Sequence, residues 1–153
     1  MNSLRCMVKT LMAVFFVTLL AFSHNSYADK QANIEIETFW VVLPPNVARS
    51  TAGYGIIKNT GDEPDTLLAI RSDGGSVMLH KTDIKSGMAR MLHMDNMIIE
   101  PGTELVLEPM SYHLMFTDLC PIIFTKGGAV KLSFEFKRAG IIELTVPLRP
   151  SWQ

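Results

Sequence analysis

Residues 130–148, which read VKLSFEFKRAGIIELTVPL, decide the fold class of this chain. Apolar and polar side chains alternate from Val130 to Phe136, the pattern of a strand that buries one face. A second strand-like run, Ile141–Leu148, follows after KRAG, a sequence compatible with a hairpin turn. The segment is therefore predicted to form an antiparallel β-hairpin.

The rest of the chain repeats this pattern at short intervals. Further strands are predicted, between clusters of Gly, Pro, Asn and Asp, at Asn33–Leu43, Thr51–Lys58, Thr66–Arg71, Ser76–Lys81, Thr103–Leu107 and Tyr112–Phe116. Residues 88–99 carry methionines spaced by three, which would form a stripe on a helix or a 3₁₀ turn as readily as a set of ligands. Gly87 and Pro101 bracket that segment too closely for a long helix, so a strand or irregular loop is favoured. Many short strands predict an all-β sandwich or barrel with Greek-key connections.

The N-terminus has the pattern of a cleavable secretory signal peptide, residues 1–28. Arg5 and Lys9 precede an apolar run from Leu11 to Phe22, and Ser26-Tyr27-Ala28 provides small residues at the cleavage site. That run is shorter than the roughly 20 residues that span a bilayer, and no later segment is apolar enough to do so. We therefore expect export from the cytoplasm.

Residues 29–153 have the size of a single domain with its own core. Arg5 and Lys9 are the only charged residues of the leader, so 12 basic residues remain against 15 acidic ones, a net charge of −3. This balance argues against a nucleic-acid partner and an anionic membrane surface, because both attract a basic patch. Cys6 precedes the apolar run and is not expected to carry a lipid, and Cys120 alone cannot form an intramolecular disulfide.

Residues 80–115 concentrate two side-chain types that are rare elsewhere. They contain every histidine outside the leader and six of the ten methionines. Neutral imidazole nitrogen and thioether sulfur together suit a soft ion of low charge such as Cu(I), whereas Mg²⁺, Ca²⁺ and Mn²⁺ prefer oxygen. The stretch predicts a copper site.

The sharpest local feature of this stretch is His113-Leu114-Met115. On a strand, His113 and Met115 project from the same face, so an imidazole and a thioether lie side by side. His80 ends a predicted strand and Met91 follows the turn DIKSG, so a hairpin-like connection can bring both to the same rim. The predicted metal ligands are His80, Met91, His113 and Met115. Thioethers, unlike thiolates, need no deprotonation to bind and do not form disulfides outside the cytoplasm.

Alternatives to this ligand set remain open. His93 is the rival of His80, and Met88 is the rival of Met91. The other methionines are interpreted as packing or turn residues, with Met78 either in the core or beside the ligands: Met78, Met94, Met97 and Met110. Asp83, Asp95 and Asp118 are interpreted as turn residues, and Cys120 as a buried or loop thiol rather than a blue-copper ligand. A metal-free extracytoplasmic β-sandwich that binds a protein partner is the alternative function.

The spacing of the four donors resembles a known family. His80, ten residues, Met91, twenty-one residues and then His113-x-Met115 match the H-x10-M-x21-H-x-M signature of periplasmic PCu(A)C-type copper chaperones. The resemblance extends to TAGYGIIKNTGDEPDTLLAI, PGTELVLEPMSYHLMF and LCPIIFTKGGAVKLSFEF, and so to nearly all of the exported chain. Two departures are the turn Pro109-Met110-Ser111, where the family often has glycines, and the C-terminus LRPSWQ, which lacks the family's occasional His- and Met-rich tail.

The resemblance implies a cupredoxin-like β-barrel and the function of a periplasmic metallochaperone. Such a protein binds Cu(I) through His80, Met91, His113 and Met115 and delivers it to an acceptor in cytochrome c oxidase assembly, an oxidase subunit or a Sco-type protein. We expect a monomer, because exposed donors must be reachable by the acceptor. We expect no enzymatic activity, since no Ser-His-Asp or Cys-His arrangement is apparent.

Overall fold

Every regular element that the structure describes is a strand. The computed structural model describes residues 32–150. Its strands within this range are β1 (Ile34–Val42), β2 (Ser50–Asn59), β3 (Asp65–Ser72), β4 (Ser76–Lys85), β5 (Met88–His93), β6 (Met97–Ile99), β7 (Glu104–Leu107), β8 (Tyr112–Thr117), β9 (Ala129–Phe136) and β10 (Gly140–Arg149). All the strands predicted from the sequence are present, and the all-β class is confirmed. Residues 88–99 form β5 and β6 rather than a helix.

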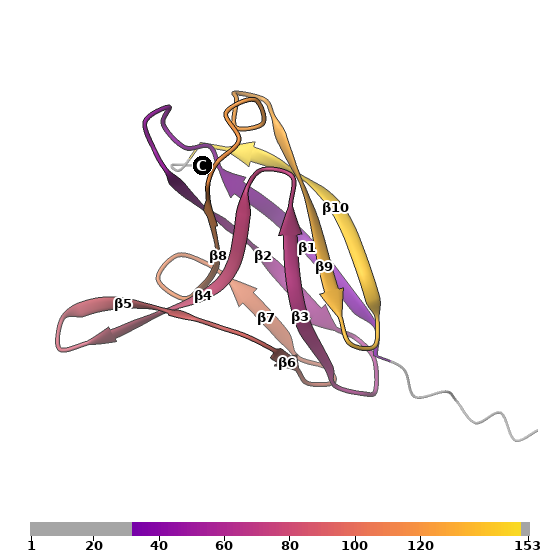
Figure 1. The fold of residues 1–153 in the computed structure, drawn as a ribbon. Coiled ribbons are helices and arrows are strands. Elements are labelled where there is room, and N and C mark those ends of the chain that lie inside the picture. The colour runs from indigo at the N-terminus through magenta and orange to yellow at the C-terminus, as the bar shows by residue number, and fades with distance from the viewer. Residues whose placement is uncertain (1–31, 151–153) are drawn as a thin grey trace, which may run out of the picture.

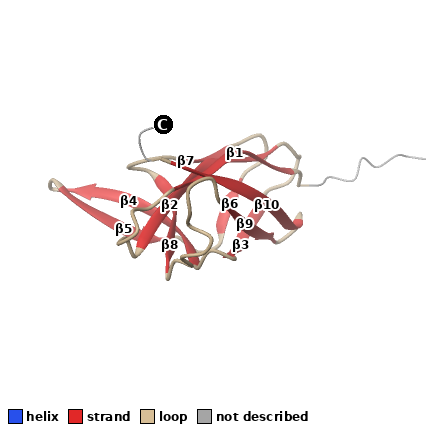
Figure 2. Cartoon of the chain, turned by 90° about the horizontal axis from the view of Figure 1, so that it is seen from above, coloured by secondary structure: helices blue, strands red, loops and turns tan. Residues whose placement is uncertain are grey.

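The strands form one curled sheet, in the order β5-β4-β8-β7-β2-β1-β10-β9-β3-β6 (Figures 1 and 2). The pairings of β1 with β10 and of β7 with β8 are parallel, and the other described pairings are antiparallel. The β9–β10 hairpin is the one predicted from KRAG. Because β3 and β4 follow each other in the chain but lie in different parts of this order, the chain crosses the molecule between them.

Gly75 allows that crossing. Its φ of +139° lies outside the range that residues with a side chain readily adopt. A Cβ at this position would also lie against the carbonyl oxygens of Thr117 and Asp118 at the end of β8. The turn thus holds the start of β4 tightly against β8, the strand that carries His113.

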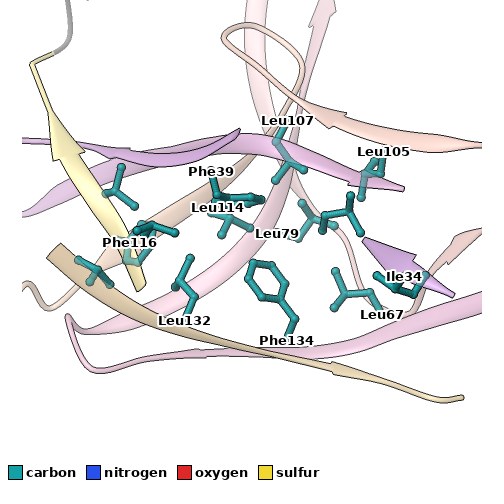
Figure 3. Close-up of a cluster of buried hydrophobic side chains, with 14 of the residues drawn as sticks. Ile34, Phe39, Leu67, Leu79, Leu105, Leu107, Leu114, Phe116, Leu132 and Phe134 are labelled. Carbon is teal, nitrogen blue, oxygen red and sulfur yellow. The ribbon is translucent and has the colours of Figure 1, made fainter. Parts of the chain in front are cut away.

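Alternate residues of the strands fill the space inside the curl (Figure 3). Phe116, Phe134, Leu114 and Leu132 are almost completely buried there, and Phe39 packs edge to face on Phe134 with ring centroids 5.4 Å apart. Each fully buried Leu or Phe side chain contributes about 1.5–3 kcal/mol of transfer free energy. The first and the last described strands both contribute to this core, β1 through Ile34 and β10 through Val146 and Leu148.

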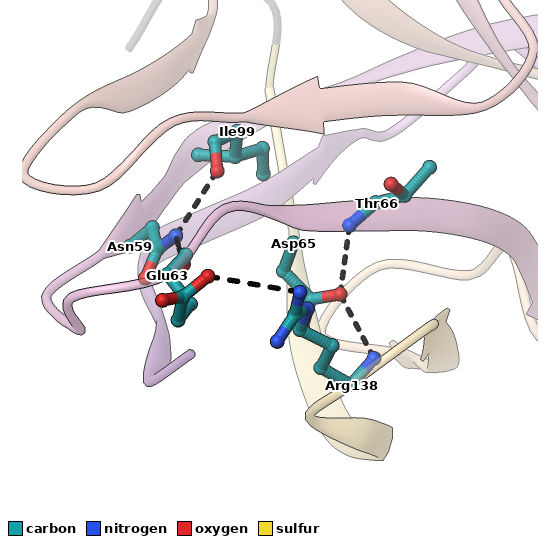
Figure 4. A network of polar contacts seen from close by, with 6 residues as sticks. All are labelled: Asn59, Glu63, Asp65, Thr66, Ile99 and Arg138. Carbon is teal, nitrogen blue, oxygen red and sulfur yellow. Dashed lines mark hydrogen bonds and ion pairs between the residues drawn. The ribbon is translucent and has the colours of Figure 1, made fainter. Parts of the chain in front are cut away.

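A buried carboxylate ties the β9–β10 turn to β3 (Figure 4). Asp65 is 1% exposed and accepts hydrogen bonds from the backbone N–H groups of Thr66 (2.7 Å), Arg138 (2.9 Å) and Ala139 (2.8 Å). Close by, the buried Asn59 donates through its side-chain amide to two backbone carbonyls. These polar side chains close one end of the sandwich without leaving their own hydrogen-bonding groups unpaired.

The β4–β5 hairpin projects from the body of the molecule in both overall views (Figures 1 and 2). All residues of β5 are exposed, and the strand pairs on one side only, with β4. Among residues 32–150, the structure has no helix with the length and apolar character needed to cross a membrane. The predicted signal peptide, residues 1–28, lies outside the described residues.

Candidate metal centre

Three histidines form a row across the neighbouring strands β8, β4 and β5. The strand register places His80 directly opposite His113 on one side and directly opposite His93 on the other. The ring centroids of His80 and His113 are 6.0 Å apart, and those of His80 and His93 are 5.5 Å apart. The described residues outside this row contain no histidine, so the fold gathers all of its imidazoles in one place.

Alternation along the strands decides which way these rings point. Leu79 and Leu114 face the core and are almost fully buried, so their neighbours His80 and His113 lie on the opposite, outer face of the sheet. His93 shares that face because it is paired with His80. The row is therefore held from behind by the hydrophobic core.

His113 has a fixed ring orientation. It is only 6% exposed, and its Nδ1 lies 3.1 Å from the backbone oxygen of Ser111. A carbonyl oxygen can only accept, so Nδ1 must be the protonated nitrogen of the neutral ring. Nε2 therefore keeps its lone pair, the form in which histidine binds a metal while a hydrogen bond orients its other nitrogen.

His80, at the centre of the row, has an unpaired buried nitrogen. Its Nδ1 is buried and makes no hydrogen bond to the described residues, an arrangement that costs free energy unless another group satisfies it. Burial lowers the pKa of His80, and the neighbouring His113 and His93 lower it further. The ring is therefore neutral at pH 7, and a metal ion suits such a site because imidazole binds metals in its neutral form.

Two of the predicted thioethers are diagonal neighbours of His80. Met115 follows His113 by two residues and lies opposite Met78 on β4. Met91 precedes His93 by two residues and lies opposite Thr82. Diagonal neighbours across a sheet have Cα atoms about 7–8 Å apart, within reach of long side chains. The structure thus surrounds His80 with His113, Met115 and Met91 on one face, with Met91 further out on the β4–β5 hairpin.

The rivals in the ligand set have different positions. Met88 lies at the tip of β5, paired with Lys85, and an odd spacing from Met91 places it on the other face. His93 remains adjacent to the site. Met78 is 42% exposed on the outer face, so the interpretation as a core residue is wrong and the interpretation as a neighbour of the ligands holds.

The remaining methionines and the cysteine are not part of the donor face beside His80. Met94 and Met97 pack against the core, as predicted. Met110 is an exposed turn residue with a φ of +66°. Cys120 follows β8 at the end remote from His113, and its backbone N–H donates to Gly74 in the β3–β4 turn.

Asp95 has a role that the sequence did not reveal. One of its carboxylate oxygens lies 2.8 Å from Nε2 of His93, whereas the sequence suggested only a turn residue. Asp83, also interpreted as a turn residue, lies inside β4 opposite Arg90. The spacing His93-x-Asp95 was the only signal available for the first contact, and it is too common to be specific.

In their present positions, the described imidazoles and carboxylates do not by themselves form a metal site on this face. Within residues 32–150, no group of three or more His, Cys, Asp and Glu side chains is arranged to hold a metal ion. Beside His80 and His113, the thioethers of Met91 and Met115 offer two further donors. Such a mixed set of neutral nitrogen and sulfur donors favours Cu(I).

Solved structures with the same fold include domains described as binding copper. The copper-bound PCuAC domain from PmoF2 is 21% identical, with a TM-score of 0.64, and the match covers 76% of this chain and 92% of that one. The Cu(I) form of DR1885 from Deinococcus radiodurans is 22% identical, with a TM-score of 0.62, over 84% of this chain and 87% of that one. The apo PCuAC domain from PmoF1 is 19% identical, with a TM-score of 0.61, over 76% and 93%. At these identities the matches establish the fold.

The chain has the fold of these PCuAC domains, and the predicted cupredoxin-like β-sandwich is confirmed. A model of the LpqE-like family, described as lipoproteins, matches residues 34–148, and the chain belongs to this family. That description indicates a location outside the cytoplasm. No protein with a curated description matches the sequence.

Proposed function

We propose that the protein is a copper carrier, which binds one Cu(I) ion through His80, Met91, His113 and Met115 and passes it to an acceptor protein. The observation that carries this proposal is the environment of His80. Its buried Nδ1 has no partner among the described residues, the ring beside it has a free Nε2 lone pair, and the two diagonal neighbours are methionines. Copper is the cargo of this site.

The position of the site suits transfer to another protein. Met91 is 60% exposed and lies on the projecting β4–β5 hairpin, so an incoming ligand from an acceptor can reach a bound ion from this side. Neutral donors leave the ion its single positive charge and require no proton release on binding. Both properties favour exchange of the ion over permanent retention.

The resemblance to PCu(A)C-type chaperones also supports a proposal for the location and the partners of the protein. We propose that the protein acts in the periplasm after removal of residues 1–28, as a monomer and without catalytic turnover. Its acceptor would be a subunit of cytochrome c oxidase or a Sco-type protein that contributes to assembly of the oxidase.

A competition titration with Cu(I) and a chromophoric chelator tests the proposal. The purified protein is compared with the His113→Ala/Met115→Ala double variant and with Met88→Leu, a control on the other face of the hairpin. We expect one tightly bound Cu(I) in the wild type and in the control, and a loss of at least about tenfold in affinity, or about 1.4 kcal/mol, in the double variant. Equal, weak binding by all three proteins would refute the proposal.

The alternative is a metal-free module that binds a protein partner. Exposed Met78, Ile84, Met91 and Leu92 favour it, because apolar side chains at a surface are typical of contact sites. This alternative predicts that the same double variant changes partner binding while no variant changes copper binding. The titration therefore separates the two functions.

A further inference from the structure

His93 is the one imidazole of the row that the proposed Cu(I) site leaves unused. It lies directly opposite His80, and the rings of these two residues are closer than those of His80 and His113, at 5.5 Å against 6.0 Å between centroids. The register of β8, β4 and β5 therefore supplies a third nitrogen donor on the same face.

Asp95 prepares the ring of His93 for metal binding. Its carboxylate oxygen lies 2.8 Å from Nε2, and a carboxylate can only accept, so Nε2 carries the hydrogen when the ring is neutral. Nδ1 then holds the free lone pair. Histidine ligands of metal ions commonly donate their other ring nitrogen to a carboxylate in this way, which orients the ring and raises its basicity as a ligand.

We propose that His93 turns toward His80 and, with His80 and His113, binds divalent copper, so that this face holds copper in either oxidation state. The inference rests on the proposed function as a copper carrier. Cu(II) prefers imidazole nitrogen in tetragonal geometry, whereas thioether sulfur favours Cu(I). Three imidazoles suit the divalent ion, and two imidazoles with two thioethers suit the monovalent ion.

The β4–β5 hairpin makes both donor sets available. His93 and Met91 are two residues apart on the same face of β5, so one strand offers either a nitrogen or a sulfur to the space beside His80. As the rings stand, they do not together enclose a metal ion. The side chain of His93 is 44% exposed, so it has room to rotate, while His80 and His113 stay in place against the core.

Binding of Cu(II) and Cu(I) by the His93→Ala variant tests this inference. The purified protein is titrated with a Cu(II) salt against glycine as competitor, and pulsed electron paramagnetic resonance counts the imidazole nitrogens on the ion. The same samples are titrated with Cu(I) under reducing conditions. Arg90→Ala is the matched control, because Arg90 is exposed on the same strand but on its other face.

We expect three imidazoles on Cu(II) in the wild type and in the control, and two in His93→Ala. The affinity of His93→Ala for Cu(II) should be at least about tenfold lower than that of the wild type, and its affinity for Cu(I) within about threefold of the wild type. Asp95→Asn should weaken Cu(II) binding about 10–100-fold, as changes to the partners of metal-bound histidines do. An unchanged Cu(II) affinity and imidazole count in His93→Ala would overturn the inference, as would an equal loss for both ions. Absence of Cu(I) binding by the wild type would instead refute the carrier function itself.

Discussion

Replacement of Asp65 by alanine should lower the stability of the protein more than a substitution at its surface. The carboxylate of Asp65 is almost completely buried and accepts three backbone hydrogen bonds, two at Oδ1 from Thr66 and Arg138 and one at Oδ2 from Ala139. Alanine leaves these three donors without their partner. At about 1–1.5 kcal/mol for each of the three lost hydrogen bonds, the free energy of unfolding should fall by about 3–4.5 kcal/mol.

Two further variants calibrate that magnitude. Asp65→Asn keeps one oxygen for Thr66 and Arg138 but turns an amide N–H₂ toward the N–H of Ala139. It therefore loses one bond and adds a repulsive contact, for a cost of about 1.5–2 kcal/mol. Asp73→Ala is the matched control, since the exposed Asp73 accepts a single backbone hydrogen bond, from Lys131 at 2.9 Å, and its loss should cost about 1 kcal/mol or less.

Urea unfolding followed by circular dichroism measures these differences. We expect the order Asp65→Ala, Asp65→Asn, Asp73→Ala from most to least destabilised, with similar dependence on urea concentration for all three. If Asp65→Ala were within 1 kcal/mol of Asp73→Ala, the buried carboxylate would not secure the β9–β10 turn, and the assignment of its three hydrogen bonds would be wrong.

Two other perturbations concern the candidate metal centre directly. Met91→Leu should lower the affinity for Cu(I) at least about tenfold, equivalent to about 1.4 kcal/mol, whereas Met88→Leu should not. The two variants are matched, because both methionines lie on β5 and both are 60% exposed. Equal effects of the two variants in a chelator competition would remove Met91 from the ligand set. Because burial and two neighbouring imidazoles lower the pKa of His80 below its ordinary 6.5, the unfolded chain binds the proton more readily. The contribution of neutral His80 to the stability of the metal-free protein should therefore be fully present above pH 6.5 and be lost as the pH falls below it. In urea titrations, His80→Gln should flatten this pH dependence. An NMR titration midpoint for His80 at or above 6.5 would contradict this reasoning.

The strands and the face shared by His113 and Met115 could be predicted because both depend on local alternation. A period of two fixes which side chains share a face whatever the strand pairs with. The same rule identified the β9–β10 hairpin from its two alternating runs and the short segment between them. Pairing of β4 with β8 could not be obtained in this way, since it joins segments far apart in the chain and depends on the whole core.

The position of His93 opposite His80 could have been predicted from the sequence. Ser86 and Gly87 both have positive φ, at 53° and 77°, which is the geometry of a two-residue hairpin turn. Such a turn pairs Lys85 with Met88, and counting back from that pair places His80 opposite His93. The turn DIKSG could be identified from the sequence, but the predicted strand ended at Lys81, so the prediction did not include this register.

The same register explains why the site has a rigid half and an adjustable half. His80 and His113 alternate with the buried Leu79 and Leu114 on the same strands, so a slip of one residue would turn the imidazoles into the core and the leucines into solvent. The hydrophobic core therefore fixes these two proposed ligands. Met91 and His93 lie on β5, where every residue is exposed and no core contact restrains them, and regions of this kind open locally at low cost. The proposed carrier function uses both halves: the fixed pair positions the ion, and the adjustable strand can withdraw its donors when an acceptor replaces them.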